Sequence, residues 1–200
     1  MTAKLKEQKV DSPVPRVIII RGTPGTGKST VAQKVVHLLK GTTKKAYIPI
    51  DDLQHLDLRN GCKDKFKLGI FHAALLCRSF IQEGFNIVVD YVFDADLDFF
   101  VDKLFRSHAT VLPPCKVQIF YVDATFETIK KRNKERKDSM PLPVLTELYE
   151  TCNAQKGRFP GKLVIDSTKL SPKATAKAIL DSKTAIVGCK KDGTLKLWEL

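Results

Sequence analysis

The stretch RGTPGTGKST, residues 21–30, carries the clearest chemistry in this sequence. It contains the spacing GxxxxGK[ST], in which glycines let the backbone wrap closely around phosphate oxygens. Successive backbone N–H groups and the N-terminus of a following helix stabilise the bound anion. In such a loop Lys28 reaches the β- and γ-phosphates, and the Ser29 hydroxyl binds Mg²⁺. We therefore expect a nucleoside triphosphate site formed by consecutive residues: Gly22, Thr23, Pro24, Gly25, Thr26, Gly27, Lys28, Ser29 and Thr30.

GTPases, motor ATPases and kinases share this loop, and other residues distinguish them. A GTPase needs an NKxD-type guanine reader, but the nearest string, NKER at residues 133–136, ends in arginine. A motor ATPase needs a strand ending in Asp-Glu, whose glutamate polarises a water, but the third expected strand ends in Asp90 and Tyr91. A kinase needs a carboxylate that accepts the proton of the acceptor hydroxyl, and cations around the transferring phosphoryl group. The sequence offers both, so a kinase is favoured.

The carboxylates follow two expected strands, KAYIPID ending at Asp51 and FNIVVD ending at Asp90. The carboxyl ends of neighbouring strands in a doubly wound sheet face one crevice, so both side chains should approach the phosphate loop. We assign Asp51 as the general base and Asp90 to the Mg²⁺ or acceptor side, with Asp52 and Gln54 as further acceptor-binding residues. Helix capping is the alternative role for Asp51 and Asp52, and a cap or turn is the alternative for Asp90.

The cations lie in TIKKRNKERKD, residues 128–138. Arg132 and Arg136 are four residues apart, so they would share one face of a helix and could clamp the charge of the transition state. The alternative is a basic helix that is simply solvated.

Apolar runs of strand length alternate with helical patterns, which is typical of a parallel sheet covered on both faces. We predict an α/β protein with the P-loop NTPase fold, a five-stranded, mainly parallel sheet. The expected strands cover residues 16–20, 45–51, 85–90, 116–123 and 162–167, and the expected helices cover 28–40, 65–84, 96–106, 125–137, 143–155 and 171–181.

The ends of the chain have their own patterns. We expect a basic arm over residues 1–14, the main domain over 15–183 and a β-hairpin-like tail over 184–200. The hairpin is predicted because Asp192 and Gly193 separate two β-prone runs. The alternative is the end of a propeller repeat belonging to a longer protein, since one repeat alone cannot bury its faces.

Composition points to the kind of partner. The net charge of +12 favours polyanions such as nucleic acid, although a lysine-rich solvated surface is the simpler explanation. The five cysteines lack the spacing of a metal site or disulfide framework. No apolar run has the length of a signal peptide or membrane span. These features favour a cytoplasmic protein with reduced thiols and no membrane contact.

From Arg16 to Gln155 the sequence resembles the P-loop phosphotransferases that include polynucleotide 5′-hydroxyl kinases, chloramphenicol phosphotransferase and zeta-toxin-like kinases. The resemblance lies in GTPGTGKST, AYIPIDDL, GFNIVVD and TIKKRNKERKDSMPLPVLTELYE, in that order. It implies an ATP-dependent kinase with Mg²⁺ as cofactor. The roles that it implies are nucleotide phosphate and Mg²⁺ contacts for Lys28 and Ser29, general base for Asp51, a place beside the acceptor for Asp90, and lid arginines for Arg132 and Arg136.

Two positions depart from the polynucleotide kinase pattern. Gln54 stands where those kinases usually carry an arginine that holds the acceptor strand, and Tyr91–Phe93 stands where they tend to have a small hydroxyl residue and asparagine. Four basic residues nearby could replace the missing arginine: Arg59, Lys63, Lys65 and Lys67. The favoured acceptor is an RNA or DNA 5′-hydroxyl. The alternatives are a small-molecule or nucleotide-sugar kinase and an ATP-binding regulatory module without catalysis.

Overall fold

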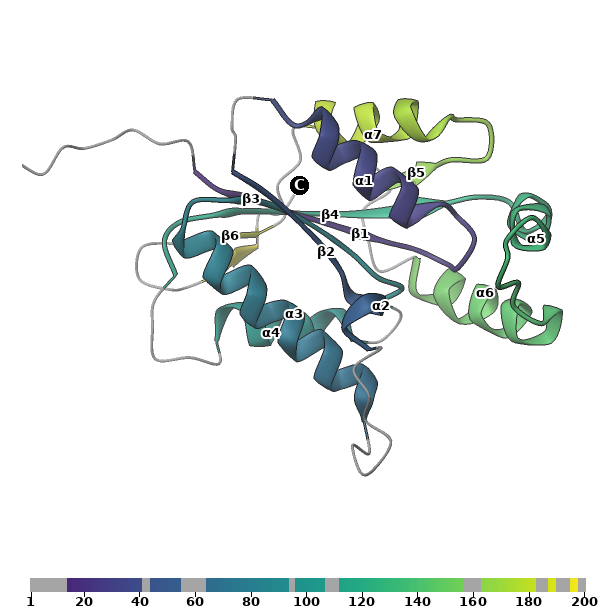
Figure 1. The fold of residues 1–200 in the computed structure, drawn as a ribbon, viewed down its shortest axis with the longest axis horizontal. Coiled ribbons are helices and arrows are strands. Elements are labelled where there is room, and N and C mark those ends of the chain that lie inside the picture. The colour runs from purple at the N-terminus through teal and green to yellow at the C-terminus, as the bar shows by residue number, and fades with distance from the viewer. Residues whose placement is uncertain are drawn as a thin grey trace, which may run out of the picture.

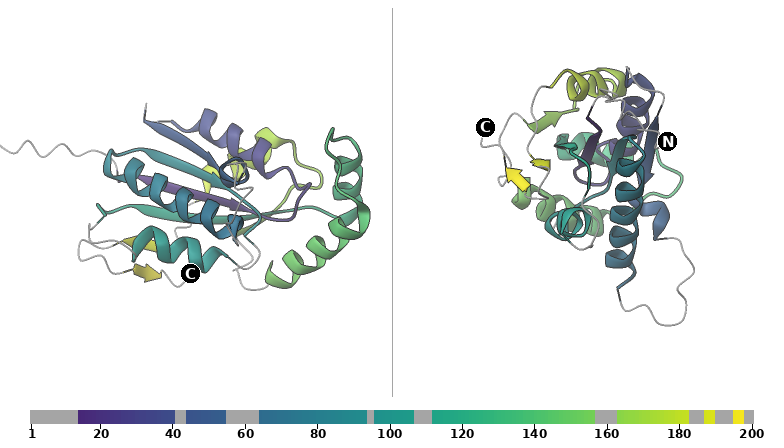
Figure 2. Two further views of the ribbon diagram at one scale, coloured as in Figure 1. Left: turned by 60° about the horizontal axis from the view of Figure 1, so that its bottom comes forward. Right: turned by 90° about the vertical axis from the view of Figure 1, so that its left-hand side faces the viewer.

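The computed structural model of this chain describes residues 14–40, 44–54, 64–93, 96–106, 112–156, 163–182, 187–189 and 195–197. A central β-sheet has helices packed on both of its faces (Figure 1). The two further views separate the layers (Figure 2). The α/β class predicted from the sequence is therefore confirmed.

Five strands form the parallel part of the sheet. They are β1 (Arg16–Arg21), β2 (Lys45–Pro49), β3 (Asn86–Asp90), β4 (Lys116–Asp123) and β5 (Val164–Asp166). Their order is β2-β3-β1-β4, and β5 pairs with the carboxyl end of β4. The register sets Asp90, the last residue of β3, opposite Ile20 of β1 and Pro49 of β2. The carboxyl ends of these three strands therefore meet at one edge of the sheet.

A hairpin extends the same sheet. Strands β6 (Val187–Cys189) and β7 (Leu195–Leu197) are antiparallel to each other, and β6 is antiparallel to the beginning of β4. The predicted pairing of these two runs is confirmed, while the Asp192-Gly193 turn lies outside the described residues. The limits of the domain and tail remain predictions.

Alternating strand residues bury two apolar layers, as expected for a sheet covered on both faces. Helices α3 (Lys65–Gln82) and α4 (Leu97–Phe105) cover the face formed by residues such as Val17 and Val89. Helices α1 (Lys28–Leu38) and α7 (Pro172–Asp181) cover the face formed by residues such as Ile18 and Phe120. Helices α5 (Phe126–Lys134) and α6 (Leu142–Lys156) lie beyond the carboxyl end of β4 (Figure 1).

Two predicted boundaries are wrong, and both affect the site. Strand β2 ends at Pro49, not at Asp51, because proline has no N–H to donate to the ladder. Asp51 and Asp52 instead lie in a short helix, α2 (Ile50–Leu53). The second error concerns α5, which ends at Lys134, so Arg136 follows the helix and does not share a helical face with Arg132.

The early end of α5 has a physical cause. The buried side-chain amide of Asn133 donates to the carbonyl of Met140 at 2.8 Å and accepts from its backbone N–H at 3.0 Å. These two bonds hold the chain in a turn between α5 and α6, and the turn carries Arg136.

Across the described ranges, no helix combines the length and the apolar character needed to cross a membrane. Three described cysteines, Cys77, Cys115 and Cys152, are buried.

Candidate active site

The loop between β1 and α1 has the geometry of a phosphate-binding loop. Gly22, Gly25 and Gly27 have positive φ angles of 143°, 88° and 92°. A Cβ on Gly22 would lie 2.1 Å from the carbonyl oxygen of Val122 on β4, so only glycine fits there. The loop leads directly into the N-terminus of α1, whose first residue is Lys28. The backbone is thus arranged to surround an anion at the positive end of the helix dipole.

Lys28 folds back over this loop. Its Nζ donates a hydrogen bond of 3.1 Å to the carbonyl of Thr23, and the side chain is buried. Burial lowers the pKa of Lys28, while the carboxylates of Asp90 and Asp51 raise it. The ammonium group therefore lies between the loop and two carboxylates, where it could contact the terminal phosphates of a nucleotide.

Ser29 and Asp90 contact each other directly. The Ser29 Oγ donates a hydrogen bond of 2.7 Å to Oδ2 of Asp90, which the parallel register brings to the phosphate loop. Asp90 is 3% exposed, and its Oδ1 is buried without a hydrogen-bond partner in the described part of the chain. Burial raises the pKa of Asp90, against hydrogen bonds from Ser29 and Tyr47. A buried carboxylate with an unpartnered oxygen beside a hydroxyl fits a Mg²⁺ ion, which takes oxygen ligands.

Among the described residues, Ser29 and Asp90 are the side chains that fit such an ion. In the ranges that the structure describes, no group of three or more His, Cys, Asp or Glu side chains could hold a metal. A Mg²⁺ ion at Ser29 and Asp90 would thus take its other ligands from phosphates and water, as Mg²⁺ commonly does with nucleotides.

Asp51 faces a cavity of about 1000 Å³ that the phosphate loop also lines. The carboxylate is exposed, and Lys28 and Ser29 line the same space. A second cavity of about 510 Å³ is also lined by Ser29, Asp51, Gln54 and Arg136. Asp52 lines the second cavity but not the first. Asp51 is therefore the carboxylate of α2 that faces both spaces.

Gln54 and Tyr91 form a pair on the wall of the larger cavity. Nε2 of Gln54 donates a hydrogen bond of 2.9 Å to the Tyr91 hydroxyl, and both residues line the cavity. Tyr91 packs edge to face on Phe93, with ring centroids 5.2 Å apart. Phe93 is fully buried with a φ of 46°, an unusual value for a residue with a bulky side chain. The wall beside Asp51 is thus neutral and closely packed.

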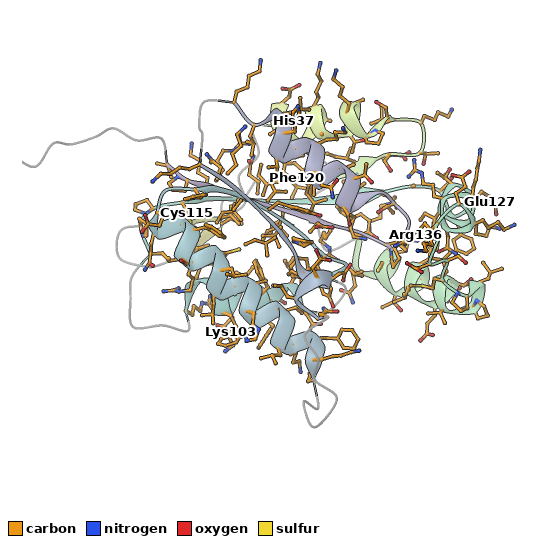
Figure 3. The ribbon with its side chains drawn as sticks, viewed as in Figure 1. His37, Lys103, Cys115, Phe120, Glu127 and Arg136 are labelled. Carbon is orange, nitrogen blue, oxygen red and sulfur yellow. The ribbon has the colours of Figure 1, made fainter. Side chains whose placement is uncertain are left out.

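The two arginines lie in different surroundings. Arg132 donates to the carbonyl of Thr26 at 3.1 Å and to the carbonyl of Ser167 at 2.9 Å, so its guanidinium is bound to the phosphate loop. Arg136 is exposed in the turn after α5, at the end of the molecule that carries the loop (Figure 3). It lines both cavities and lies near enough to Lys28 to lower that residue's pKa.

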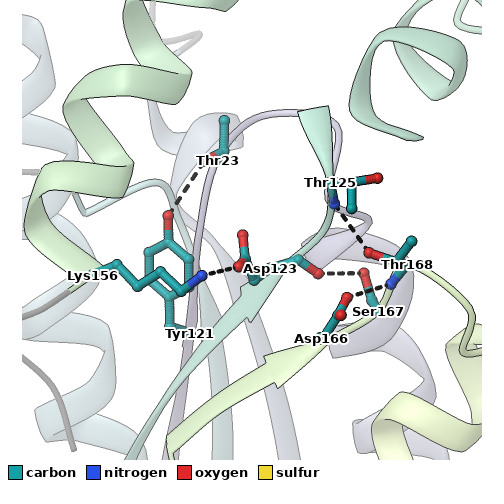
Figure 4. A network of polar contacts seen from close by, with 8 residues as sticks. All are labelled: Thr23, Tyr121, Asp123, Thr125, Lys156, Asp166, Ser167 and Thr168. Carbon is teal, nitrogen blue, oxygen red and sulfur yellow. Dashed lines mark hydrogen bonds and ion pairs between the residues drawn. The ribbon is translucent and has the colours of Figure 1, made fainter. Parts of the chain in front are cut away.

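Sequence analysis missed a polar network that connects the phosphate loop to the carboxyl ends of β4 and β5 (Figure 4). Ser167 Oγ lies 3.1 Å from the carbonyl of Thr26 and 2.8 Å from that of Asp123, positioned to donate to either. The hydroxyls of Thr23 and Tyr121 are 3.3 Å apart, and Lys156 of α6 pairs with Asp123. The signal for Ser167 was its place at the end of the fifth expected strand, since the carboxyl ends of parallel strands meet at one edge of the sheet.

The remaining predicted residues divide between the described and undescribed ranges. Lys65 and Lys67 lie in the first turn of α3, where Lys67 lines the larger cavity and Lys65 the smaller one. Arg59 and Lys63 lie outside the described residues. Sequence analysis also missed three residues that line the larger cavity, Leu170, Pro172 and Thr175.

Several solved structures share this fold. A sugar kinase from Janibacter sp. is 19% identical, with a TM-score of 0.59 over 84% of this chain and 93% of that one. A tunicamycin resistance protein from Deinococcus radiodurans is 16% identical, with a TM-score of 0.61 over 86% of this chain and 98% of that one. A chain of the Pnkp1/Rnl/Hen1 RNA repair complex is 16% identical, with a TM-score of 0.57 over 80% of this chain and 49% of that one.

No protein-family model matches the chain, and no curated protein matches it either. The structural matches establish the fold: the chain has the P-loop α/β fold that these solved structures share, as predicted from the loop and the strand pattern.

Proposed function

We propose that this protein is an ATP- and Mg²⁺-dependent kinase that transfers the γ-phosphate to a hydroxyl group. The observation that carries the proposal is the shared lining of one cavity by Lys28, Ser29, Asp51 and Arg136. A phosphate loop alone would serve any nucleotide hydrolase. An exposed carboxylate facing the same space adds the group that a hydroxyl acceptor requires.

Each residue has one task in the proposed transfer. Asp51 takes the proton from the acceptor hydroxyl while the acceptor oxygen forms a bond to the γ-phosphorus and the bond to the nucleoside diphosphate oxygen breaks. Lys28 and the loop N–H groups bind the phosphate oxygens, and the guanidinium of Arg136 offsets the charge that accumulates on the transferring group. Arg132 holds the loop through the carbonyls of Thr26 and Ser167. Mg²⁺, held at Ser29 and Asp90, would neutralise phosphate charge.

The favoured acceptor is the 5′-hydroxyl of a polynucleotide. The net charge of +12 and the basic side chains of Lys65, Lys67 and Arg136 around the cavities support a polyanionic acceptor. The fold is also shared with a chain of an RNA repair complex.

A second candidate is a small-molecule kinase. The neutral Gln54–Tyr91 pair beside Asp51 supports it, because that wall offers no cation to an acceptor phosphate. The fold is equally shared with a sugar kinase and a tunicamycin resistance protein.

Label transfer from γ-labelled ATP tests the proposal. The acceptors would be 5′-hydroxyl RNA, 5′-hydroxyl DNA, nucleosides, sugars and other hydroxylated small molecules, each with and without Mg²⁺. We expect Mg²⁺-dependent label on the oligonucleotides. Transfer to small acceptors alone would support the second candidate. Tight ATP binding without transfer to any acceptor would contradict the kinase and favour an ATP-binding module.

A further inference from the structure

The first turn of α3 carries an aromatic side chain that no other described element covers. Phe66 is 50% exposed, and among the described residues it is the only aromatic residue in the exposed class. It lines the larger cavity together with Asp51 and Gln54. An aromatic ring left half in water beside a candidate active site is an available contact surface for a ligand.

Phe66 continues the apolar stripe of α3 past the part that packs on the sheet. Ile70, Ala73, Cys77 and Ile81 follow Phe66 at spacings of three or four residues, and all four are buried in one core cluster. Phe66 has the same helical phase but lies in the first turn of the helix, where it lines the larger cavity. The ring therefore lies on the packing face of the helix, but it is not part of the core cluster that the later turns join.

Cations flank the ring. The Nζ of Lys65 is 5.3 Å from the Phe66 ring centroid, and Lys65 lines the smaller cavity. Lys67 pairs with Asp64 at 3.4 Å, but both side chains are about half exposed, so the pair costs little to open. An exposed aromatic ring with lysines before and after it in the helix is a combination that suits single-stranded nucleic acid, since bases stack and the backbone phosphates are neutralised.

We propose that Phe66 is the stacking platform for the 5′-terminal base of the acceptor and that Lys65 and Lys67 contact its first phosphates. The inference rests on the proposed kinase function and gives its acceptor site a chemical class, a nucleic-acid end. Gln54 and Tyr91 line the same cavity as Phe66 and Asp51, and in this arrangement their neutral side chains would lie against the ribose. In this proposal Lys65 and Lys67 of α3 contact the acceptor phosphate, in place of an arginine at position 54.

A comparison of Phe66→Ala with substrate variants tests the platform. With 5′-hydroxyl oligonucleotides, we expect Phe66→Ala to lower kcat/KM by about 5- to 150-fold through a higher acceptor KM, the range typical of one stacked base. An oligonucleotide whose 5′-terminal residue is abasic should show the same loss with the parent protein and no further loss with Phe66→Ala. Phe66→Tyr should keep near-parent values. Leu76→Ala, an exposed apolar residue of the same helix, is the matched control and should be unchanged.

Binding without catalysis provides an independent measurement. Phe66→Trp should show tryptophan fluorescence that a 5′-hydroxyl oligonucleotide quenches to saturation, after subtraction of the parent protein's single tryptophan. An abasic 5′ end should quench it less. Lys65→Ala and Lys67→Ala should weaken oligonucleotide binding and flatten its salt dependence, and Lys116→Ala, exposed at the start of β4, should do neither.

The outcomes separate the two proposals. If oligonucleotides are phosphorylated but Phe66→Ala matches Leu76→Ala, the platform is refuted and the kinase remains. If only small molecules are phosphorylated, or if oligonucleotides leave the fluorescence of the Phe66→Trp variant unchanged, the nucleic-acid platform is also refuted. If the Phe66→Trp signal is quenched but no acceptor gains phosphate, the platform holds and the kinase proposal fails.

Discussion

The amide of Gln54 lies 2.9 Å from the hydroxyl oxygen of Tyr91, so the two positions that depart from the polynucleotide kinase pattern contact each other. Gly69 of α3 makes the contact possible, because a Cβ there would lie 2.8 Å from Cγ of Gln54. The close approach of α2 and α3 therefore sets the position of the Gln54 amide beside Asp51.

This relationship gives the first prediction. Tyr91→Phe removes the hydrogen bond but keeps the ring that packs on Phe93, so we expect a loss of about 1 kcal/mol in the free energy of unfolding. The acceptor KM should rise while the ATP KM stays constant. Gly69→Ala should have the same kinetic effect, since it displaces Gln54. Steady-state kinetics and urea unfolding measure both quantities.

A double-mutant cycle with Gln54→Ala and Tyr91→Phe checks the pair itself. The coupling energy in acceptor kcat/KM should be about 0.5–1.5 kcal/mol. Additive effects would mean that the bond does not act on the acceptor.

The second prediction separates the two arginines. Arg136→Ala should lower kcat by about 10²-fold or more with ATP affinity retained, because its guanidinium would meet the transferring group. Arg132→Ala should instead raise the ATP KM and lower the unfolding temperature, because it releases the carbonyls of Thr26 and Ser167. Lys134→Ala, exposed at the end of α5, is the control. Identical kinetic profiles for the two arginine variants would support a shared clamp and contradict this division.

The arginines also show where sequence reasoning reaches its limit. Their spacing indicated one helical face, and only a tertiary contact, the bonds from buried Asn133 to Met140, ends the helix between them. By contrast, the meeting of Ser29 and Asp90 was predictable. The β-branched runs indicated neighbouring parallel strands, whose carboxyl ends were expected to face one crevice beside the phosphate loop.

The third prediction concerns Asp90. Asp90→Asn should raise the Mg²⁺ concentration for half-maximal activity by about 10-fold or more, a typical cost of losing a group that supports a metal. The unfolding temperature without ligands should stay equal or rise, because the variant removes a carboxylate whose pKa burial raises. Asp98→Asn, on the exposed face of α4, is the control. An unchanged Mg²⁺ requirement would exclude Asp90 from the metal site.

The fourth prediction concerns the donor side. Lys28→Ala should weaken ATP binding by about 10- to 100-fold, the value of one charge-assisted bond to a phosphate. Lys34→Ala, exposed on the same helix, should bind ATP like the parent protein. Calorimetric titration measures the affinity. Equal affinity for the two variants would refute the phosphate-loop assignment of Lys28.

Asp51 illustrates a partly correct prediction. Its approach to the phosphate loop was expected from a strand end, whereas it comes from the short helix α2 that follows Pro49. The sequence favoured Asp51 over Asp52 as the base because Asp51 was expected to end the strand, but both residues are exposed in α2. The cavities do separate them, because only Asp51 of the two faces the larger one.

That difference allows the most direct test of the whole account, single-turnover phosphoryl transfer to a 5′-hydroxyl oligonucleotide with parent protein, Asp51→Asn and Asp52→Asn. We predict that Asp51→Asn lowers the rate by about 10²- to 10⁴-fold, the usual contribution of a general base, with ATP affinity unchanged. Asp52→Asn should stay within about threefold of the parent, the effect expected of a residue outside the chemical step. Equal rates for Asp51→Asn and the parent protein would contradict the central claim that Asp51 activates the acceptor.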